Sequence, residues 1–279
     1  MRTKNENLDE IEYACIGEHP LLLDLHIPVN RAPPYPVVVW LFGGGWNRGD
    51  RRGRPVVRLV DDNLYQHGYA IAAIDYRLSG EAKFPAQLED CKAAIRFLRK
   101  HAESFELDAN QIGVWGFSAG AHLAALLGLT GSTKQFDVGD NLEISSQVQA
   151  VCAFAVTGDF RRVNAENSCD DPNDPSSATA QLFGGRIQEK MDLVIRANPV
   201  TYISQHAPPF LLIHGEKDGL VSCEQSKLLH DALTEAGVES TLYIIPDGDH
   251  GMAGLDQTEV QHILNITEGF FQKHLRIAV

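Results

Sequence analysis

The sequence predicts an α/β fold in which helices cover both faces of a mostly parallel central sheet. Apolar segments of strand length alternate with segments of helix length along the 279-residue chain, as in sheets whose parallel strands are joined by helices. The run Val37–Phe42 is continuously apolar, which indicates a strand buried on both faces. No internal repeat or low-complexity tract divides the chain, so we predict a single domain over residues 1–279.

The N-terminal elements differ from this pattern. Glu10–Cys15 and Pro20–Ile27 have the length of strands, and every second residue from Leu21 to Ile27 is apolar. A period of two is typical of a strand with one buried face. We therefore expect an antiparallel hairpin at an edge of the sheet.

The later elements follow in regular order. The helix predicted at Pro85–Lys100 has proline in its first turn and an apolar face. The other predicted strands are Tyr69–Ile74, Ile112–Trp115, Ala150–Phe154, Phe210–His214 and Thr241–Ile245, and the other predicted helices start at Ala119 or span Cys223–Ala236 and Thr258–His274.

The segment Thr157–Pro209 interrupts the alternation. Its first half, Asn164–Ser177, is polar and contains proline, and short helices are expected around Ala178–Leu182 and Glu189–Ala197. Because long insertions in compact domains usually have a function, we interpret this one as a lid or as a wall of a substrate pocket. A solvated surface excursion is the alternative.

Composition narrows the class of protein. The 37 acidic and 24 basic residues give a net charge of −13, which argues against a nucleic-acid or anionic-membrane partner. No apolar run approaches a membrane span and the N-terminus lacks a signal-type segment, so we expect a cytoplasmic protein unless a leader has been removed. The five scattered cysteines form no C-x-x-C pair, and Asp170, Asp171 and Asp174 lack a calcium-loop spacing. We expect no metal and no organic cofactor.

A Gly-x-Ser-x-Gly pattern occupies Gly116–Gly120, between the strand Ile112–Trp115 and the next helix. A turn this tight strains the backbone of Ser118 and leaves no room for a Cβ at the flanking glycines. The serine hydroxyl is then exposed at a strand end. Chance alone would produce the pattern in roughly one shuffled sequence in ten, so the prediction of a nucleophilic Ser118 depends on the other loops.

In open parallel sheets, functional sites lie beyond the carboxyl ends of the strands. Gly43–Gly45 follow the strand Val37–Phe42, and glycines there can aim backbone amides at a developing oxyanion. A tight turn that needs positive φ is the alternative. Asp218 follows the strand Phe210–His214 and is the candidate carboxylate that orients a histidine; a helix-capping role and a competing Glu216 are the alternatives.

His250 is the histidine best placed to act as a general base. Of eleven histidines, it alone lies in a glycine-rich loop between the last strand and the last helix, from which it can approach Ser118. His122 follows Ser118 by one helical turn and is interpreted as a packing residue. His214 ends a strand and is interpreted as a core histidine.

The order Ser118, Asp218, His250 is that of the α/β-hydrolase triad, and further motifs accompany it. They are Gly43-Gly44-Gly45-Trp46 with Gly49-Asp50, Asp75-Tyr76-Arg77-Leu78, Phe84-Pro85-Ala86-Gln87, Gly116-Phe117-Ser118-Ala119-Gly120-Ala121-His122-Leu123, Pro208-Pro209-Phe210, His214-Gly215 and His250-Gly251.

With these motifs, the stretch from about Leu23 to Phe271 resembles the α/β-hydrolase family of acetyl xylan esterase-like and feruloyl esterase-like proteins. It is also similar to hormone-sensitive-lipase-like esterases and kynurenine formamidases. The resemblance implies an α/β-hydrolase fold and a serine carboxylesterase whose oxyanion hole is formed by the amides of Gly44, Gly45 and Ala119. The family usually has histidine before the three glycines, where this chain has Phe42, so the side-chain hydrogen bond that braces the loop is expected to be absent.

We therefore expect the protein to hydrolyse short-chain esters through an acyl-enzyme on Ser118. Acetyl esters are the expected substrates, and esters of carbohydrates are included. The partner is a small-molecule or carbohydrate ester, and a homodimer is left open. Two alternatives remain. One is an amidase of the kynurenine-formamidase kind. The other is a binding protein that keeps the fold but has lost turnover, which the replacement of the family histidine by Phe42 favours.

Overall fold

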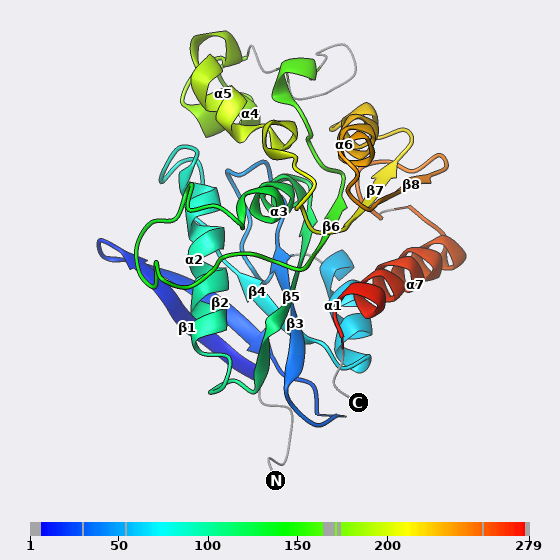
Figure 1. Ribbon diagram of the computed structural model, residues 1–279. Coiled ribbons are helices and arrows are strands. Elements are labelled where there is room, and N and C mark those ends of the chain that lie inside the picture. The colour runs from blue at the N-terminus through cyan, green and yellow to red at the C-terminus, as the bar shows by residue number, and fades with distance from the viewer. Residues whose placement is uncertain are drawn as a thin grey trace.

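The computed structural model describes residues 7–29, 31–53, 55–163, 171, 174–252 and 254–276, with the backbone alone for residues 55–60. In this part of the chain, eight strands form one sheet in the order β1-β2-β4-β3-β5-β6-β7-β8 (Figure 1). β1 pairs with β2, and β2 with β4, in antiparallel orientation, whereas all later pairs are parallel. The predicted α/β architecture with an antiparallel hairpin at one edge is confirmed.

The bounds of the elements are as follows. The strands are β1 (Asn7–Ile16), β2 (His19–His26), β3 (Tyr35–Leu41), β4 (Ala70–Ile74), β5 (Leu107–Phe117), β6 (Ala150–Phe154), β7 (Phe210–Gly215) and β8 (Ser240–Ile245). The α-helices are α1 (Pro55–Gln66), α2 (Ala86–Lys100), α3 (Ala119–Thr130), α4 (Ala178–Phe183), α5 (Met191–Ala197), α6 (Glu224–Glu235) and α7 (Gln257–His274).

Helices cover both faces of the sheet, as predicted. Helices α1 and α7 contact each other on one face, and α2 and α3 contact each other on the opposite face (Figure 1). Strands β3, β4, β6 and β7 are buried along their whole lengths. This burial from two sides explains why their sequences are continuously apolar.

Two elements differ most from the sequence prediction. Helix α1 was not predicted, because no Ser, Thr, Asp or Asn directly precedes Pro55 to mark a helix start. Strand β5 begins at Leu107 instead of Ile112. The extra residues are mostly polar, and their pairing with β3 shifts register after Tyr35. They show no sustained alternation of apolar and polar residues that would have predicted a strand there.

The segment Thr157–Pro209 contains short helices, including α4 and α5 close to where they were expected. A buried hydrogen bond joins its two ends, since Asn198 Nδ2 donates to Asp159 Oδ1 at 2.6 Å. Gln225 Oε1 on α6 attaches the first end to the domain by accepting hydrogen bonds from the Gly158 and Asp159 amides at 3.0 and 2.9 Å. Residues 164–170 lie outside the described residues. None of the described helices is long and apolar enough to cross a membrane.

Candidate active site

The Gly-x-Ser-x-Gly turn joins β5 to α3 and holds Ser118 in the left-handed region, with φ 55° and ψ −119°. A Cβ at Gly116 would lie 2.3 Å from the carbonyl oxygen of Gly120, and one at Gly120 would lie 2.1 Å from that of Leu41. Both glycines are thus required by close backbone approach, as the sequence predicted. The turn leaves Ser118 partly exposed at the carboxyl edge of the sheet.

Ser118, His250 and Asp218 form a continuous hydrogen-bonded chain. His250 Nε2 lies 3.0 Å from Ser118 Oγ, and His250 Nδ1 lies 2.7 Å from Asp218 Oδ2. The three residues come from the β5–α3 turn, the loop after β8 and the loop after β7. This geometry lets the imidazole accept the serine proton while the carboxylate fixes its tautomer.

Asp218 is buried, with 6% of its surface exposed, and both of its oxygens have partners. Oδ1 accepts hydrogen bonds from the backbone amides of Leu220 and Val221, at 2.8 Å each. Burial alone would raise the pKa of Asp218, but the hydrogen bonds from His214 and His250 outweigh it and hold the pKa well below its usual range. The carboxylate therefore stays charged next to His250.

The alternatives considered for Asp218 are not realised. Helix α6 begins at Glu224 with Cys223 as its N-cap, so Asp218 does not cap it. Glu216 is exposed, and its carboxylate accepts the backbone amide of Asp247 at 3.1 Å.

His214 contributes to the site in a way the sequence did not reveal. Its ring is fully buried, as the core interpretation expected. However, its Nε2 lies 2.8 Å from the Val221 carbonyl oxygen and 3.2 Å from Asp218 Oδ2, and its Nδ1 lies 2.6 Å from Ser226 Oγ. Both neighbours of Nε2 are acceptors, so Nε2 carries the proton and Nδ1 accepts from the serine. The spacing of Asp218 four residues after a strand-end histidine was the available signal.

His122 has the packing role predicted for it. It is fully buried on α3, its Nε2 donates to the carbonyl oxygen of Ala197 at 2.7 Å, and its ring meets the edge of Trp46 with centroids 5.3 Å apart. Burial lowers the pKa of His122 from 6.5 to about 4. The residue is thus a neutral support between the glycine loop and the insertion.

The glycine loop passes directly beside Ser118. A Cβ at Gly43 would lie 3.2 Å from Ser118 Cβ, and both Gly44 and Gly45 have positive φ, at 122° and 60°. Ala119 is the first residue of α3, so its amide has no acceptor within the helix. Backbone amides at a glycine loop and at a helix N-terminus are donors of the kind that an oxyanion hole uses, and the assignment of Gly44, Gly45 and Ala119 to this role stays a prediction.

Phe42 occupies the position of the family histidine and is braced differently. Its ring stacks on Tyr76 with centroids 4.2 Å apart and planes 7° apart. The Tyr76 hydroxyl donates to the Phe42 carbonyl oxygen at 2.7 Å, and burial raises the pKa of Tyr76, which keeps this donor protonated. The brace therefore comes from the main chain of Phe42 and the tyrosine of the Asp-Tyr-Arg motif.

A buried ion-pair cluster holds the far end of the same loop. Arg51 Nε lies 3.0 Å from Asp24 Oδ1 on β2, and Arg51 Nη1 lies 2.5 Å from Asp75 Oδ2 after β4. The Arg51 amide also donates to Asp75 at 2.8 Å. Carboxylates on β2 and directly after β4 thus fix the loop that carries Gly44 and Gly45.

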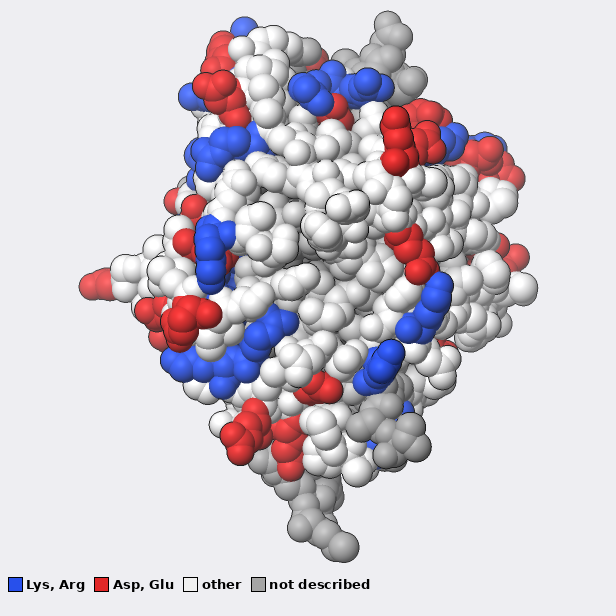
Figure 2. Space-filling model, in the orientation of Figure 1, with Lys and Arg blue, Asp and Glu red and all other residues white. Residues whose placement is uncertain are grey.

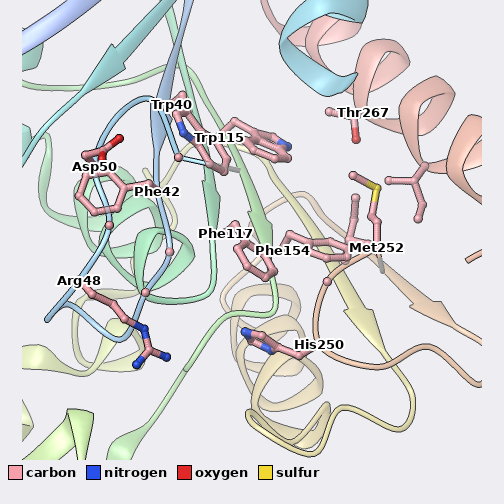
Figure 3. A pocket seen from close by; sticks show the side chains of 17 residues that line it. Trp40, Phe42, Arg48, Asp50, Trp115, Phe117, Phe154, His250, Met252 and Thr267 are labelled. Atoms are coloured by element: carbon pink, nitrogen blue, oxygen red, sulfur yellow. The ribbon is translucent and has the colours of Figure 1, made fainter. Parts of the chain in front are cut away.

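Two cavities meet at the site and share Gly44, Arg48, Phe117 and His250 in their walls. The first, of about 220 Å³, is the apolar compartment; Figure 3 shows Trp40 and Trp115 at one end of it and His250 at the other. The second, of about 390 Å³, is the polar compartment. Its walls include insertion residues from Thr157 to Thr179.

The described residues contain no cluster of three or more groups suited to hold a metal ion. Of the acidic cluster noted in the sequence, Asp171 and Asp174 line the polar compartment, and Asp170 lies outside the described residues.

The parallel sheet, the serine elbow and the strand-end loops define an α/β-hydrolase fold. The chain belongs to the BD-FAE family, whose model matches residues 23–233. A structure described as the truncated form of a carbohydrate esterase from gut microbiota has a TM-score of 0.84 at 28% identity, with 96% of each chain covered. A bifunctional GH43-CE protein of Bacteroides eggerthii has a TM-score of 0.84 at 32% identity, over 95% of this chain and 35% of that one.

Among curated proteins, the chain is 30% identical to the probable carboxylic ester hydrolase LipM of Mycobacterium tuberculosis over 253 residues. This match covers 88% of the chain and 57% of LipM. The chain thus spans a little more than half the length of this relative.

Proposed function

We propose that the protein is a serine carboxylesterase that hydrolyses short-chain esters, acetyl esters and acylated carbohydrates among them. The observation that carries the proposal is the unbroken chain from Ser118 Oγ to His250 Nε2 at 3.0 Å and from His250 Nδ1 to Asp218 Oδ2 at 2.7 Å. The similarity to a carboxylic ester hydrolase and to a carbohydrate esterase supports this reaction class.

The reaction has two halves. Ser118 Oγ attacks the ester carbonyl carbon while His250 takes its proton, and the resulting oxyanion accepts hydrogen bonds from the amides of Gly44, Gly45 and Ala119. His250 then protonates the leaving alcohol. Water attacks the acyl-enzyme with His250 again as base, and the carboxylic acid leaves as the serine regains its proton.

The polar compartment supports a hydroxyl-bearing alcohol. Its lining includes Thr157, Ser176 and Ser222 together with Asp171, groups that can exchange hydrogen bonds with sugar hydroxyls. On the face shown in Figure 2, charged side chains lie mainly around the rim and the centre is mostly uncharged.

Two substitutions test the proposal with p-nitrophenyl acetate and an acetylated xylo-oligosaccharide as substrates. Ser118→Ala and His250→Ala should each lower kcat by about 10³-fold or more. Ser204→Ala and His206→Ala, at exposed positions outside the site, serve as matched controls and should hydrolyse both esters at the parent rate. Hydrolysis by Ser118→Ala at that rate would refute the proposal.

A parallel assay separates the amidase alternative. If kcat/KM for N-formylkynurenine exceeded that for every ester tested, while Ser118→Ala was inactive, Ser118 would still be the nucleophile but the substrate class would be amides.

A further inference from the structure

The two compartments divide the site by chemistry. Both are lined by His250, whose Nε2 lies 3.0 Å from Ser118 Oγ, so an ester bound to Ser118 can extend into both. The walls of the apolar compartment beyond the shared residues are mainly aromatic and aliphatic, and they include Trp40, Trp115, Phe154, Ile213, Met252 and Ile263. Its charged neighbours, Arg48 and Asp50, are exposed.

Chemistry assigns one half of the ester to each compartment. A sugar hydroxyl in the apolar compartment would lose its hydrogen bonds to water, at a cost of about 1–3 kcal/mol each. A hydrocarbon chain gains by leaving water, by about fourfold in affinity for each buried methylene. The alcohol therefore fits the polar compartment and the acyl chain fits the apolar one.

The size of the apolar compartment exceeds what an acetyl group can fill. A cavity of roughly 150 Å³ lined by Leu, Ile and Phe holds a benzene ring, and this one measures about 220 Å³. We propose that it is an acyl-binding site for straight chains of about four to six carbons, and that these acyl groups are preferred over acetyl. The proposal rests on the proposed esterase function and names its substrate class.

Ile263 is one residue that limits the length of the acyl chain. Ile263 on α7 is 2% exposed and lines the compartment. A phenylalanine at this position adds bulk inside the cavity and shortens the space open to the acyl chain. Gln272 lies on the exposed surface of the same helix, so Gln272→Phe is a matched control that adds an aromatic ring outside it.

The first experiment measures kcat/KM for p-nitrophenyl esters of two to ten carbons. For the parent protein, we expect a rise of at least tenfold from acetyl to a maximum between butyryl and hexanoyl, and then a fall. Ile263→Phe should move the maximum to a shorter chain, whereas Gln272→Phe should keep the parent profile. Rapid acetyl hydrolysis with a steady decline from acetyl to hexanoyl would overturn the proposal and leave the esterase function intact.

The second experiment needs no turnover. Calorimetry of Ser118→Ala should give at least about tenfold tighter binding of hexanoate than of propionate, with a markedly smaller difference in Ser118→Ala/Ile263→Phe. Equal affinities in Ser118→Ala would overturn the acyl-binding site whether or not any ester is hydrolysed. Conversely, selective hexanoate binding without hydrolysis of any ester by the parent protein would refute the esterase function and retain the apolar site.

Discussion

Nε2 of His214 lies 3.2 Å from Oδ2 of Asp218, the same oxygen that His250 contacts at 2.7 Å. Asp218 is thus held by two histidines, one inside the core and one at the site. Because Ser226 bonds to the other nitrogen of His214 at 2.6 Å, the chain of hydrogen bonds extends from α6 through Asp218 to Ser118.

Replacing His214 should impair catalysis through Asp218. His214→Leu removes one of the hydrogen bonds that hold the pKa of Asp218 low, so the carboxylate is held less firmly and is protonated at a higher pH. We expect kcat/KM for p-nitrophenyl acetate to fall about tenfold, in line with a lost hydrogen bond to a charged group, and the acidic limb of its pH profile to move to higher pH. His214→Gln keeps an N–H donor and should recover part of both effects. If the pH profile of His214→Leu matched that of the parent, His214 would have only a packing role.

Gly44 should tolerate no side chain. A Cβ there would lie 2.1 Å from the carbonyl oxygen of Arg48, at a φ of 122°. We expect Gly44→Ala to lower kcat by about 10²–10³-fold, the typical cost of losing one oxyanion donor. Gly80→Ala is the matched control, because nothing lies within 4 Å of a Cβ at that exposed glycine. Similar kcat values for the two variants would argue against an oxyanion role for this loop.

The brace on the glycine loop should depend on Tyr76 more than on the ring of Phe42. Tyr76→Phe leaves the buried carbonyl of Phe42 without its 2.7 Å donor, which should lower the free energy of unfolding by about 1–3 kcal/mol and kcat about tenfold. Phe42→His should remain active, since the main-chain acceptor is unchanged. Urea denaturation and steady-state kinetics measure both effects; loss of all activity in Phe42→His alone would show that its ring shapes the site.

The free energy of unfolding should depend on pH through His122. The unfolded chain protonates this histidine near 6.5, but the folded protein does so only near pH 4. Between these values the unfolded state binds more protons, so stability present above pH 6.5 falls as the pH falls, by about 3 kcal/mol in total. His122→Gln retains a donor for Ala197 but cannot titrate. Its urea-unfolding free energy should fall by about 3 kcal/mol less than the parent's over this range; parallel curves would contradict the assignment.

The fold could be predicted from the sequence wherever burial leaves a pattern. Strands such as Val37–Phe42 are apolar because helices cover both of their faces, and the glycines around Ser118 are required by the elbow itself. By contrast, α1 begins without an N-cap signal, and β5 extends through polar residues after Leu107. Local patterns could not indicate either one.

For the candidate site, the loops that follow three strands ending at the same edge of the sheet pointed to Ser118, Asp218 and His250. The structure brings these side chains within hydrogen-bond distance, and their catalytic roles stay predictions. The contact of His214 with Asp218 and the hydrogen bond from Tyr76 to Phe42 depend on side-chain geometry across strands, which spacing does not encode. The cytoplasmic location, a homodimer and a single domain over residues 1–279 stay predictions.

The central claim is that Ser118 is an activated nucleophile. The most direct measurement is intact-protein mass spectrometry after reaction with diethyl p-nitrophenyl phosphate, followed by peptide mapping. We predict one diethylphosphoryl group per chain on Ser118, with labelling of His250→Ala slowed by at least about 10²-fold. Absence of label on Ser118, or equal labelling rates with and without His250, would contradict the account.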